Sequence, residues 1–173
     1  VEVLGKLRTL YPDGVQTGGN SSALVDAAAG AVVVSGAVAS KHRRGCVPLA
    51  RLVASATVGV PPEIMGIGPA PAIRLLLERS GLRLDQIALF EINEAQGAQV
   101  VAVERELGLD RERLNVHGGA IALGHPLAAT GVRLTITLAR ALRKRKERYG
   151  IASACIGGGQ GIALLIENPD YAA

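Results

Sequence analysis

Three short motifs carry the side chains of this chain that are best suited to chemistry, and each follows an apolar run typical of a strand. The first begins at Asn93, the second runs over 118–126 and includes His125, and the third runs over 155–161 from Cys155 through a run of glycines. An amide, an imidazole and a thiol suit acyl transfer and carbanion chemistry. The nucleophile that this chemistry needs is not evident in the chain.

The pattern of apolar residues predicts the elements that position these motifs. From residue 48 it predicts strands over 49–56, 87–92, 114–116, 149–154 and 161–166 and helices over 70–79, 93–107 and 126–146. The resulting order, βαβαβαββ, is typical of a layered α/β fold with a mostly parallel five-stranded sheet, helices on both faces and one antiparallel pair at the end. Ligands bind outside the C-terminal ends of such strands, so we expect Asn93, His125 and Cys155 to meet in one crevice.

The N-terminal part of the chain does not continue this series. Its composition predicts a polar, glycine-rich loop over 17–22, an alanine-rich helix over 22–29 and a buried strand over 31–34. These elements are too few for a core of their own. We therefore expect residues 1–47 to be the tail of a preceding, incomplete domain and residues 48–173 to form a C-terminal domain. The missing start methionine leads us to expect a fragment or a processed product.

Each of the motif side chains also has a purely structural interpretation. If Pro126 lies in the first turn of a helix, the helix dipole keeps His125 neutral and able to act as a general base; alternatively, this histidine caps the helix or is satisfied in the core. Cys155 lies beside glycines whose amides can face a bound oxygen, but a free cysteine is often a small buried apolar residue. Asn93 either positions a water or carbonyl, or caps the next helix, with Glu94 in its first turn.

Composition narrows the class of protein. The chain has 173 residues, 49% of them apolar, with one Phe and three Tyr, so its core must be aliphatic. The net charge is +4, and basic residues cluster over 140–148, which indicates the solvated end of a helix or a site for an anionic ligand. The cysteines have no metal-ligand spacing, and no nucleic-acid motif, secretion signal or long apolar run is present. We expect no metal, no nucleic acid, no membrane span, and a cytoplasmic location, with the mitochondrial matrix left open.

The motifs together resemble those of the thiolase family, the acetyl-CoA acyltransferases and acetyl-CoA acetyltransferases. Three stretches are similar to C-terminal signatures of the family: residues 93–95, 115–126 and 155–161. Residues 19–22 and 65–69 also resemble family segments. The similarity extends over roughly residues 4–168 in the order of the family, so the chain resembles the C-terminal part of a thiolase.

The resemblance implies a role for each motif residue. His125 resembles the histidine that activates a nucleophilic cysteine and contributes to an oxyanion hole. Cys155 resembles the second cysteine of the family, which moves a proton on or off the α-carbon of acetyl-CoA. Asn93 resembles the residue that holds the water of the first oxyanion hole, and the amide of Gly157 resembles part of the second.

The resemblance also implies contacts with the substrate. Ser22 resembles a contact to the pantetheine arm of CoA, and Met65 corresponds to a residue near that arm. Gln96 stands where the family usually has Phe, which implies a polar wall in the acyl pocket. The nucleophilic cysteine of the family belongs to its N-terminal half, and Cys46 does not lie in a matching motif.

From the resemblance we expect acyl transfer between a 3-ketoacyl-CoA and CoA, by thiolysis or the reverse Claisen condensation, with CoA as substrate and no cofactor. We expect the isolated chain to be inactive, because the half with the nucleophile is absent. The expected partners are acyl-CoA, CoA and the missing N-terminal half, and the complete enzyme is expected to be a homodimer or tetramer. The alternatives are a non-catalytic module that binds CoA esters or assembles with a partner, and a truncated relic that does not fold stably alone.

Overall fold

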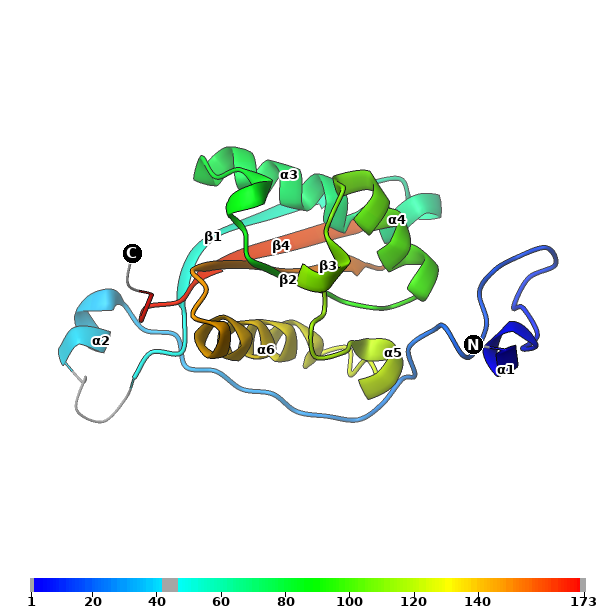
Figure 1. Ribbon diagram of the computed structural model, residues 1–173, viewed down its shortest axis with the longest axis horizontal. Helices are drawn as coiled ribbons and strands as arrows, with labels where there is room; N and C mark the ends of the chain where they lie inside the picture. The colour runs from blue at the N-terminus through cyan, green and yellow to red at the C-terminus, as the bar shows by residue number, and fades with distance from the viewer. Residues whose placement is uncertain (1, 42–46, 172–173) are drawn as a thin grey trace.

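The computed structural model describes residues 2–41 and 47–171 of the chain. It shows a layered body, in which a sheet lies between helices, and a long N-terminal arm that extends from it (Figure 1). The α/β class is therefore as predicted. The sequence also raised Cys46, a cysteine without a matching motif, and this residue lies outside the described ranges.

Within the described residues the sheet has four strands in the spatial order β1-β4-β3-β2. They are β1 (Arg51–Gly59), β2 (Leu89–Ile92), β3 (Tyr149–Ile156) and β4 (Gln160–Glu167). β2 and β3 are parallel, whereas β4 lies between β3 and β1 and is antiparallel to both. β1, β2 and β3 thus share one direction, but β2–β3 is the one parallel pair of neighbours in this sheet. The prediction of a mostly parallel sheet with one antiparallel pair at its end is therefore wrong in this respect. β4 lies inside the sheet, where it makes two antiparallel pairs.

The predicted fifth strand over 114–116 does not form. Leu114 makes one isolated parallel bridge with Phe90, and Asn115 then adopts a positive φ of 47°. The Asn115 side chain binds the edge of β2: its oxygen accepts from the Ile92 N–H at 2.8 Å, and its nitrogen donates to the Ile92 carbonyl at 2.9 Å. The Asn115 side chain therefore occupies the N–H and carbonyl of Ile92, which a fifth strand would have used for backbone hydrogen bonds.

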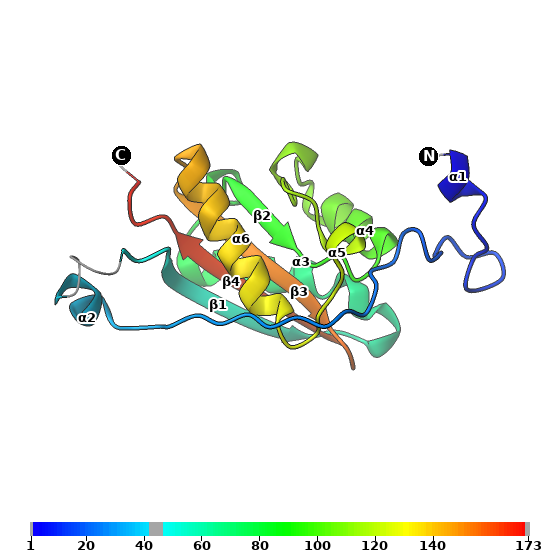
Figure 2. The same ribbon diagram turned by 90° about the horizontal axis from the view of Figure 1, so that it is seen from below.

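The longer helices cover both faces of the sheet (Figures 1 and 2). They are α3 (Pro69–Ser80), α4 (Gly97–Leu107) and α6 (Thr130–Arg145). The shorter α-helices are α1 (Glu2–Gly5), α2 (Gly36–Lys41) and α5 (Ala120–Leu123). Three short 3₁₀-helices are labelled η1 (Pro62–Ile67), η2 (Leu84–Gln86) and η3 (Arg111–Arg113). Gly81 and Gly108 end α3 and α4 in the left-handed conformation, close to the helix ends that the sequence predicted at 79 and 107. The proline-rich stretch over 61–71 contains η1 and the start of α3.

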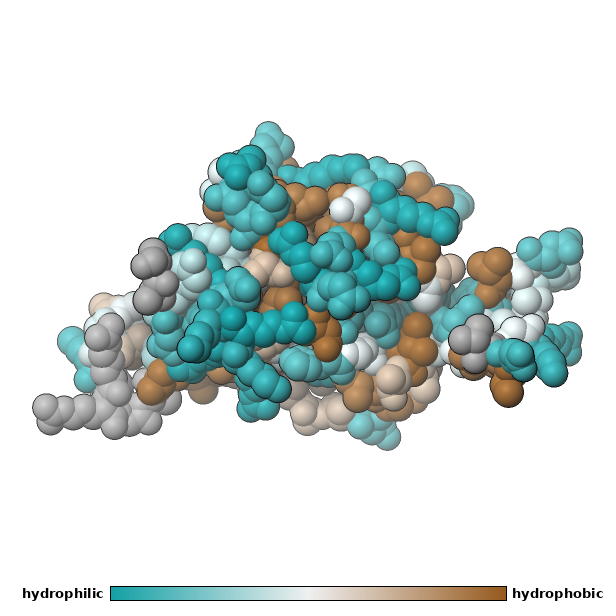
Figure 3. All heavy atoms as spheres, viewed as in Figure 1, coloured by the Kyte–Doolittle hydropathy of each residue, from teal (hydrophilic) through white to brown (hydrophobic). Residues whose placement is uncertain are grey.

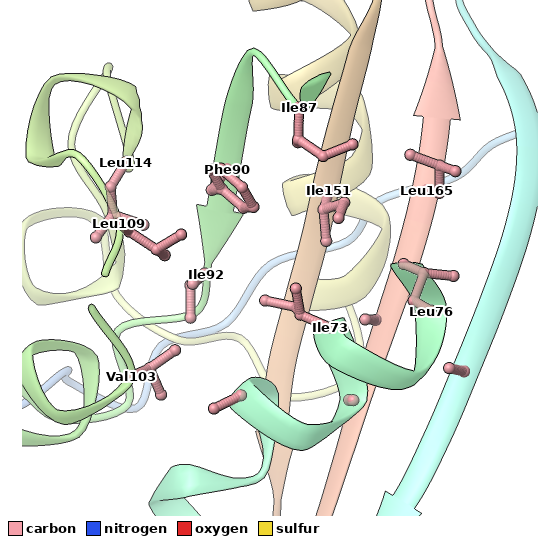
Figure 4. Close-up of a cluster of buried hydrophobic side chains, with 14 of the residues drawn as sticks. Ile73, Leu76, Ile87, Phe90, Ile92, Val103, Leu109, Leu114, Ile151 and Leu165 are labelled. Carbon is pink, nitrogen blue, oxygen red and sulfur yellow. The ribbon is translucent and has the colours of Figure 1, made fainter. Parts of the chain in front are cut away.

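Two apolar clusters fill the space between these layers. The first lies between the sheet and the α3–α4 side and includes Ile73 and Phe90 (Figure 4). The second lies between the sheet and α6 and includes Leu89 and Leu138. Because side chains alternate along a strand, Glu91 of β2 lies on the α6 side together with Leu89.

The N-terminal arm differs from the sequence prediction. Residues 22–35 form neither helix nor strand, so the predicted helix over 22–29 and buried strand over 31–34 are wrong for this structure. Val32 is 91% exposed and Val33 74% exposed. The arm runs extended along the α6 side of the body (Figures 1 and 2), and Figure 3 shows exposed apolar atoms along that lower edge. A strand needs a pairing partner and a short helix needs an apolar face to pack on, and the described part of the chain supplies neither here.

The sheet and the longer helices all follow residue 48. Earlier in the chain, the described residues form only the short helices α1 and α2. The division into residues 1–47 and 48–173 nevertheless remains a prediction. In the described ranges, no helix has both the length and the apolar character to cross a membrane.

Candidate active site

The candidate site lies at the C-terminal end of β2, beside β3. Asn93 follows β2 directly, and its N–H donates to the Ser153 carbonyl at 2.9 Å. Its side chain is fully buried. The prediction that a helix begins at Asn93 is wrong, because α4 begins at Gly97 after Gln96 in an extended conformation. The amide of Asn93 is therefore not used as a helix cap and can contact other groups.

His125 lies in the segment between α5 and α6. Its N–H donates to the Ala23 carbonyl of the arm at 2.8 Å, and its side chain is half-buried. Pro126 is not in the first turn of α6 as predicted, because the helix begins at Thr130 and the Pro126 carbonyl accepts from the Thr130 N–H at 2.9 Å. The ring thus precedes the helix by a full turn, where the influence of the helix dipole is weak.

Both ring nitrogens of His125 have partners. Nδ1 lies 2.7 Å from Thr130 Oγ1, and Nε2 lies 3.3 Å from Asn93 Nδ2. The Thr130 hydroxyl has one hydrogen, which it uses in a hydrogen bond to the Pro126 carbonyl at 3.0 Å. In the contact with Nδ1 the hydroxyl oxygen is therefore the acceptor, and Nδ1–H is the donor. Nε2 then carries the lone pair and accepts from the Asn93 amide. This tautomer presents a basic nitrogen beside Asn93, as a general base requires.

The surroundings of His125 favour the neutral ring. Burial lowers the pKa of His125 below its ordinary value, and the positive charge of Arg133 lowers this pKa further. The sequence predicted a neutral imidazole from the helix dipole. In the structure, desolvation and a neighbouring cation favour that form of the ring instead.

Cys155 lies near the end of β3, paired with Gly161 of β4. It is 9% exposed, and burial raises the pKa of its thiol. A thiol with a raised pKa remains protonated near neutral pH, so it is better suited to donate a proton than to attack as a thiolate. Because Ile92 pairs with Ser153, Asn93 and Cys155 lie at the same end of two neighbouring strands.

The loop between β3 and β4 contains the glycines that the sequence singled out. Gly157 is exposed, and a Cβ added there would meet nothing within 4 Å, so the space beside its Cα is open. Gly158 and Gly159 have positive φ values of 88° and 95°, which favour glycine. A Cβ on Gly159 would lie 2.2 Å from the Val60 carbonyl oxygen, so the loop packs directly on the chain after β1.

The residues predicted to bind substrate lie around α4. The N–H and Oγ of Ser22 both donate to the Ala95 carbonyl, at 3.1 and 3.2 Å, and Ser21 forms an isolated bridge with Gln96. The structure thus brings Ser22 and Gln96 together. Met65 is half-buried in η1, which packs against α4 on the other side.

Sequence reasoning missed two residues that hold this site together. Thr130 is the Nδ1 partner of His125, and its signal was a hydroxyl five residues after the histidine. Glu94, predicted in the first turn of a helix, instead accepts from Asn115 Nδ2 at 2.9 Å and from the Ile121 N–H at 3.1 Å. It therefore ties α5, and with it the segment that carries His125, to the end of β2.

Other candidates lie outside this arrangement. His117, which precedes the glycine pair of the second motif, is exposed. Among the described residues, no group of three or more His, Cys, Asp and Glu side chains is placed to hold a metal ion. A cavity of about 340 Å³ is lined by Asp85, Leu89 and Arg113 among others, at the opposite end of β2, and we do not assign it to this site.

Known proteins match the part of the chain that contains this site. Residues 46–168 match the family model described as "Thiolase, C-terminal domain". The chain is 48% identical over 169 residues to an acetyl-CoA acetyltransferase of Shinella zoogloeoides, covering 97% of the chain and 43% of that relative. It is also 48% identical over 169 residues to the mitochondrial 3-ketoacyl-CoA thiolase of Bos taurus, covering 97% of the chain and 42% of that relative.

Solved structures give the same result. The acetyl-CoA acetyltransferase of Bacillus anthracis superposes with a TM-score of 0.92 at 49% sequence identity, covering 96% of this chain and 42% of that one. Human mitochondrial 3-ketoacyl-CoA thiolase in complex with CoA superposes with a TM-score of 0.88 at 46% identity, with the same coverage of 96% and 42%. The chain therefore spans less than half the length of the relatives that it matches.

Proposed function

The chain belongs to the thiolase family, whose C-terminal domain it contains, and we propose that within a complete thiolase it serves acyl transfer between a 3-ketoacyl-CoA and CoA. The observation that carries this proposal is the contact between His125 and Asn93, in which Nε2 lies 3.3 Å from the amide nitrogen. In this proposal His125 is the neutral base beside the end of β2, and Cys155, near the same end of the neighbouring strand β3, is the proton donor.

In the proposed thiolysis, a cysteine from a part of the enzyme that this chain does not cover attacks the 3-keto carbonyl, and Nε2 of His125 accepts the proton of that cysteine. The bond between C2 and C3 breaks, and its electron pair passes to the departing acetyl-CoA unit. Cys155 donates its thiol proton to this carbanion, and the acyl group stays on the nucleophilic cysteine as a thioester. The thiol of free CoA then takes the acyl group, and the reverse sequence is a Claisen condensation. Dividing the work between a nucleophile and an acid makes each step easier.

Asn93 and Gly157 are proposed to stabilise negative charge on oxygen. Asn93 Oδ1 is buried and has no hydrogen-bond partner among the described residues, so it is available to accept from a water that in turn donates to the substrate oxygen. Gly157 is exposed and has open space beside its Cα, so a substrate oxygen could approach its amide.

Ser22, Gln96 and Met65 are proposed to line the path of the CoA ester. The support for this proposal is where these residues lie. Ser22 and Gln96 lie at the start of α4, and η1, which contains Met65, also packs against α4. We propose that CoA enters as a substrate and that no resident cofactor takes part. The oligomeric state and the cytoplasmic location remain predictions.

The decisive experiment is restoration of activity by a missing part. We expect the purified chain, given acetoacetyl-CoA and CoA, to show no turnover, because it lacks the nucleophile. We expect thiolysis when the chain is co-expressed with the N-terminal part of a thiolase relative. In that complex, Cys155→Ser and His125→Asn should each lower kcat by about 10²-fold or more, whereas Arg79→Ala, exposed on α3, should leave it unchanged.

Two outcomes would contradict the proposal. Turnover by the isolated chain that disappears on changing Cys46 or Cys155 would show that the nucleophile is present here. Binding of CoA by the assembled complex without any turnover would favour the non-catalytic alternative, a module that only binds CoA esters.

A further inference from the structure

The N-terminal arm crosses the candidate site through residues 20–25, which we call the strap. The first half of the strap is bonded to the connection between β2 and α4. The Asn20 carbonyl accepts from the Gly97 N–H at 2.7 Å, and the N–H and Oγ of Ser22 both donate to the Ala95 carbonyl. These hydrogen bonds tie the strap to the segment that leads from β2 into α4.

The second half of the strap lies against the segment that carries the imidazole, where the arm passes α5 (Figures 1 and 2). The Ala23 carbonyl accepts from the His125 N–H at 2.8 Å. Val25 packs on Gly124, the residue before the histidine, because a Cβ added to Gly124 would lie 2.5 Å from one methyl carbon of Val25 and 2.7 Å from the other. The strap therefore holds the histidine segment by a backbone hydrogen bond and by an apolar side chain.

These two sets of contacts are adjacent in the chain. Ser22 and Ala23 are consecutive residues, and consecutive Cα atoms are only about 3.8 Å apart. So short a link leaves little slack, and a shift of the segment around Ala95 moves the strap against His125. The histidine lies after α5 and before α6, so no helix of its own holds its backbone.

Asn20 anchors the beginning of the strap. Its side-chain oxygen accepts from the Thr17 N–H at 2.7 Å, and its side-chain nitrogen donates to the Val15 carbonyl at 2.8 Å. An asparagine that bonds the preceding loop in this way fixes the direction in which the chain leaves the loop. The strap is thus held at its beginning by Asn20 and at its end by Val25.

We propose that Val25 is a positioning residue for His125, and that the strap sets the place of the imidazole relative to the segment that carries Gln96. The ring contacts Asn93 through Nε2 at 3.3 Å, which is near the upper limit for a hydrogen bond, so a small shift of the backbone breaks this contact. A misplacement of about 1 Å can lower the rate of an enzyme by about 10²-fold. The catalytic meaning rests on the proposed function, but the position of the histidine is a property of this chain.

The position of His125 is measured in the 173-residue chain by amide hydrogen exchange and by NMR of the histidine rings. Val25→Ala removes both methyl carbons that contact Gly124, so we expect the His125 amide to exchange about tenfold faster or more and the ring signals to shift. Because Val25 is 39% exposed, the truncation should leave the fold intact. Val25→Ile keeps the branched packing and should match the parent chain.

A matched control and a reference separate local release from general loss of stability. Val32→Ala makes the same truncation on the same arm, where Val32 is 91% exposed, and should change neither measurement. The exchange rate of His125 is expressed relative to that of the buried Val103 amide in α4, and the exposed His117 is the reference ring. Unchanged exchange and ring signals in Val25→Ala, or equal changes in Val32→Ala, would overturn the proposal.

A second variant acts at the other end of the strap. Asn20→Ala removes both side-chain hydrogen bonds to the preceding loop, and it should also speed exchange of the His125 amide, because it frees the strap that holds this amide. Unchanged exchange in Asn20→Ala would show that the strap does not transmit its anchoring to the histidine.

The complex restored with an N-terminal part tests the catalytic meaning. There Val25→Ala should lower kcat by about tenfold and change KM by less than about twofold, since Val25 acts on the base and not on the substrate. A higher KM with an unchanged kcat would make Val25 a substrate contact and overturn the positioning role. If the parent complex shows no turnover, the proposed function fails, and the exchange measurements on the isolated chain still decide whether the strap positions His125.

Discussion

Thr130 determines which nitrogen of His125 is basic. Its hydroxyl donates a hydrogen bond to the Pro126 carbonyl and has no second hydrogen, so the ring donates from Nδ1–H and keeps its lone pair on Nε2. A threonine at the start of α6 thereby aims the lone pair at the end of β2. The tautomer of this histidine is fixed by a hydrogen bond on the side of the ring away from the proposed chemistry.

Changing Thr130 therefore tests the tautomer. Thr130→Val removes the acceptor and leaves a buried Nδ1–H unpaired, so we expect the chain to lose about 1–3 kcal/mol of unfolding free energy. The nitrogen chemical shifts of the ring should then show a mixture of tautomers. Thr130→Ser keeps the hydroxyl and is expected to match the parent chain in both measurements. A ring that keeps its Nδ1–H form in Thr130→Val would contradict the assignment.

Glu91 makes stability depend on pH. Burial raises the pKa of its carboxyl to about 7 from an ordinary 4.5, so between these values the folded chain holds a proton that the unfolded chain releases. The stabilisation from this proton is complete below about pH 4.5 and is lost as the pH rises through about 7, an effect of about 3 kcal/mol at most. Glu91→Gln should remove this decline, as measured by urea unfolding at pH 5 and pH 8. An undiminished decline in the variant would show that other groups cause it.

The motif residues were predictable from the sequence, but their neighbours were not. Asn93, His125 and Cys155 belong to short segments whose types and order carry the signal. Thr130 and Arg133 depend on where α6 begins, and the sequence placed that start at Pro126, which shifts the face that the helix presents to β2. Glu91 looked like one polar residue in an apolar strand, and only the layer of α6 shows that it is buried.

Elements in this fold approach each other through glycines. A Cβ on Gly161 at the start of β4 would lie 2.0 Å from the Gly68 carbonyl oxygen, so the strand and the beginning of α3 are in backbone contact. This contact fixes η1, and Met65 with it, against the glycine loop. Neither neighbour can move away without displacing a whole element.

Gly161→Ala should therefore be much more disruptive than Gly157→Ala in the loop that precedes β4. We expect Gly161→Ala to lower the unfolding free energy by about 2 kcal/mol or more, because backbone atoms cannot yield as a flexible side chain does. At Gly157 an added Cβ meets nothing within 4 Å, so little change is expected. Thermal unfolding of both variants measures the difference, and equal effects would show that the close approach does not limit stability.

The element ends that the sequence predicted correctly are those with their own stop signals. α3 and α4 end at glycines, and the hairpin of β3 and β4 is interrupted by a glycine run. The segment over 31–34 had only an apolar run to support it, and the segment over 114–116 only Leu114 and Val116. The first finds no partner strand in the described chain, and the second loses its place to the Asn115 side chain. Apolar runs predict burial, but the location of the partner decides whether a strand forms.

The exposed arm has a consequence for the whole molecule. The chain covers 42% of the length of the mitochondrial relative that it matches, and its arm leaves apolar residues in solvent on the α6 side. Contiguous exposed apolar surface on a folded chain marks a surface that another part of a protein covers. Under the proposed function, that part is the N-terminal half of the enzyme.

We therefore expect Val32→Asp to separate folding from assembly. Because Val32 is 91% exposed, the charge should change the unfolding free energy of the isolated chain by no more than about 0.5 kcal/mol. If the segment over 31–34 becomes buried against the N-terminal half, the same charge should abolish co-purification with that half, since an unpaired carboxylate would be desolvated. Arg79→Asp, on the opposite face of the sheet, is the matched control and should co-purify normally. Normal co-purification of Val32→Asp would mean that the segment over 31–34 stays in solvent in the complete enzyme. The predicted buried strand would then be wrong for the complete enzyme, as it is for the chain alone.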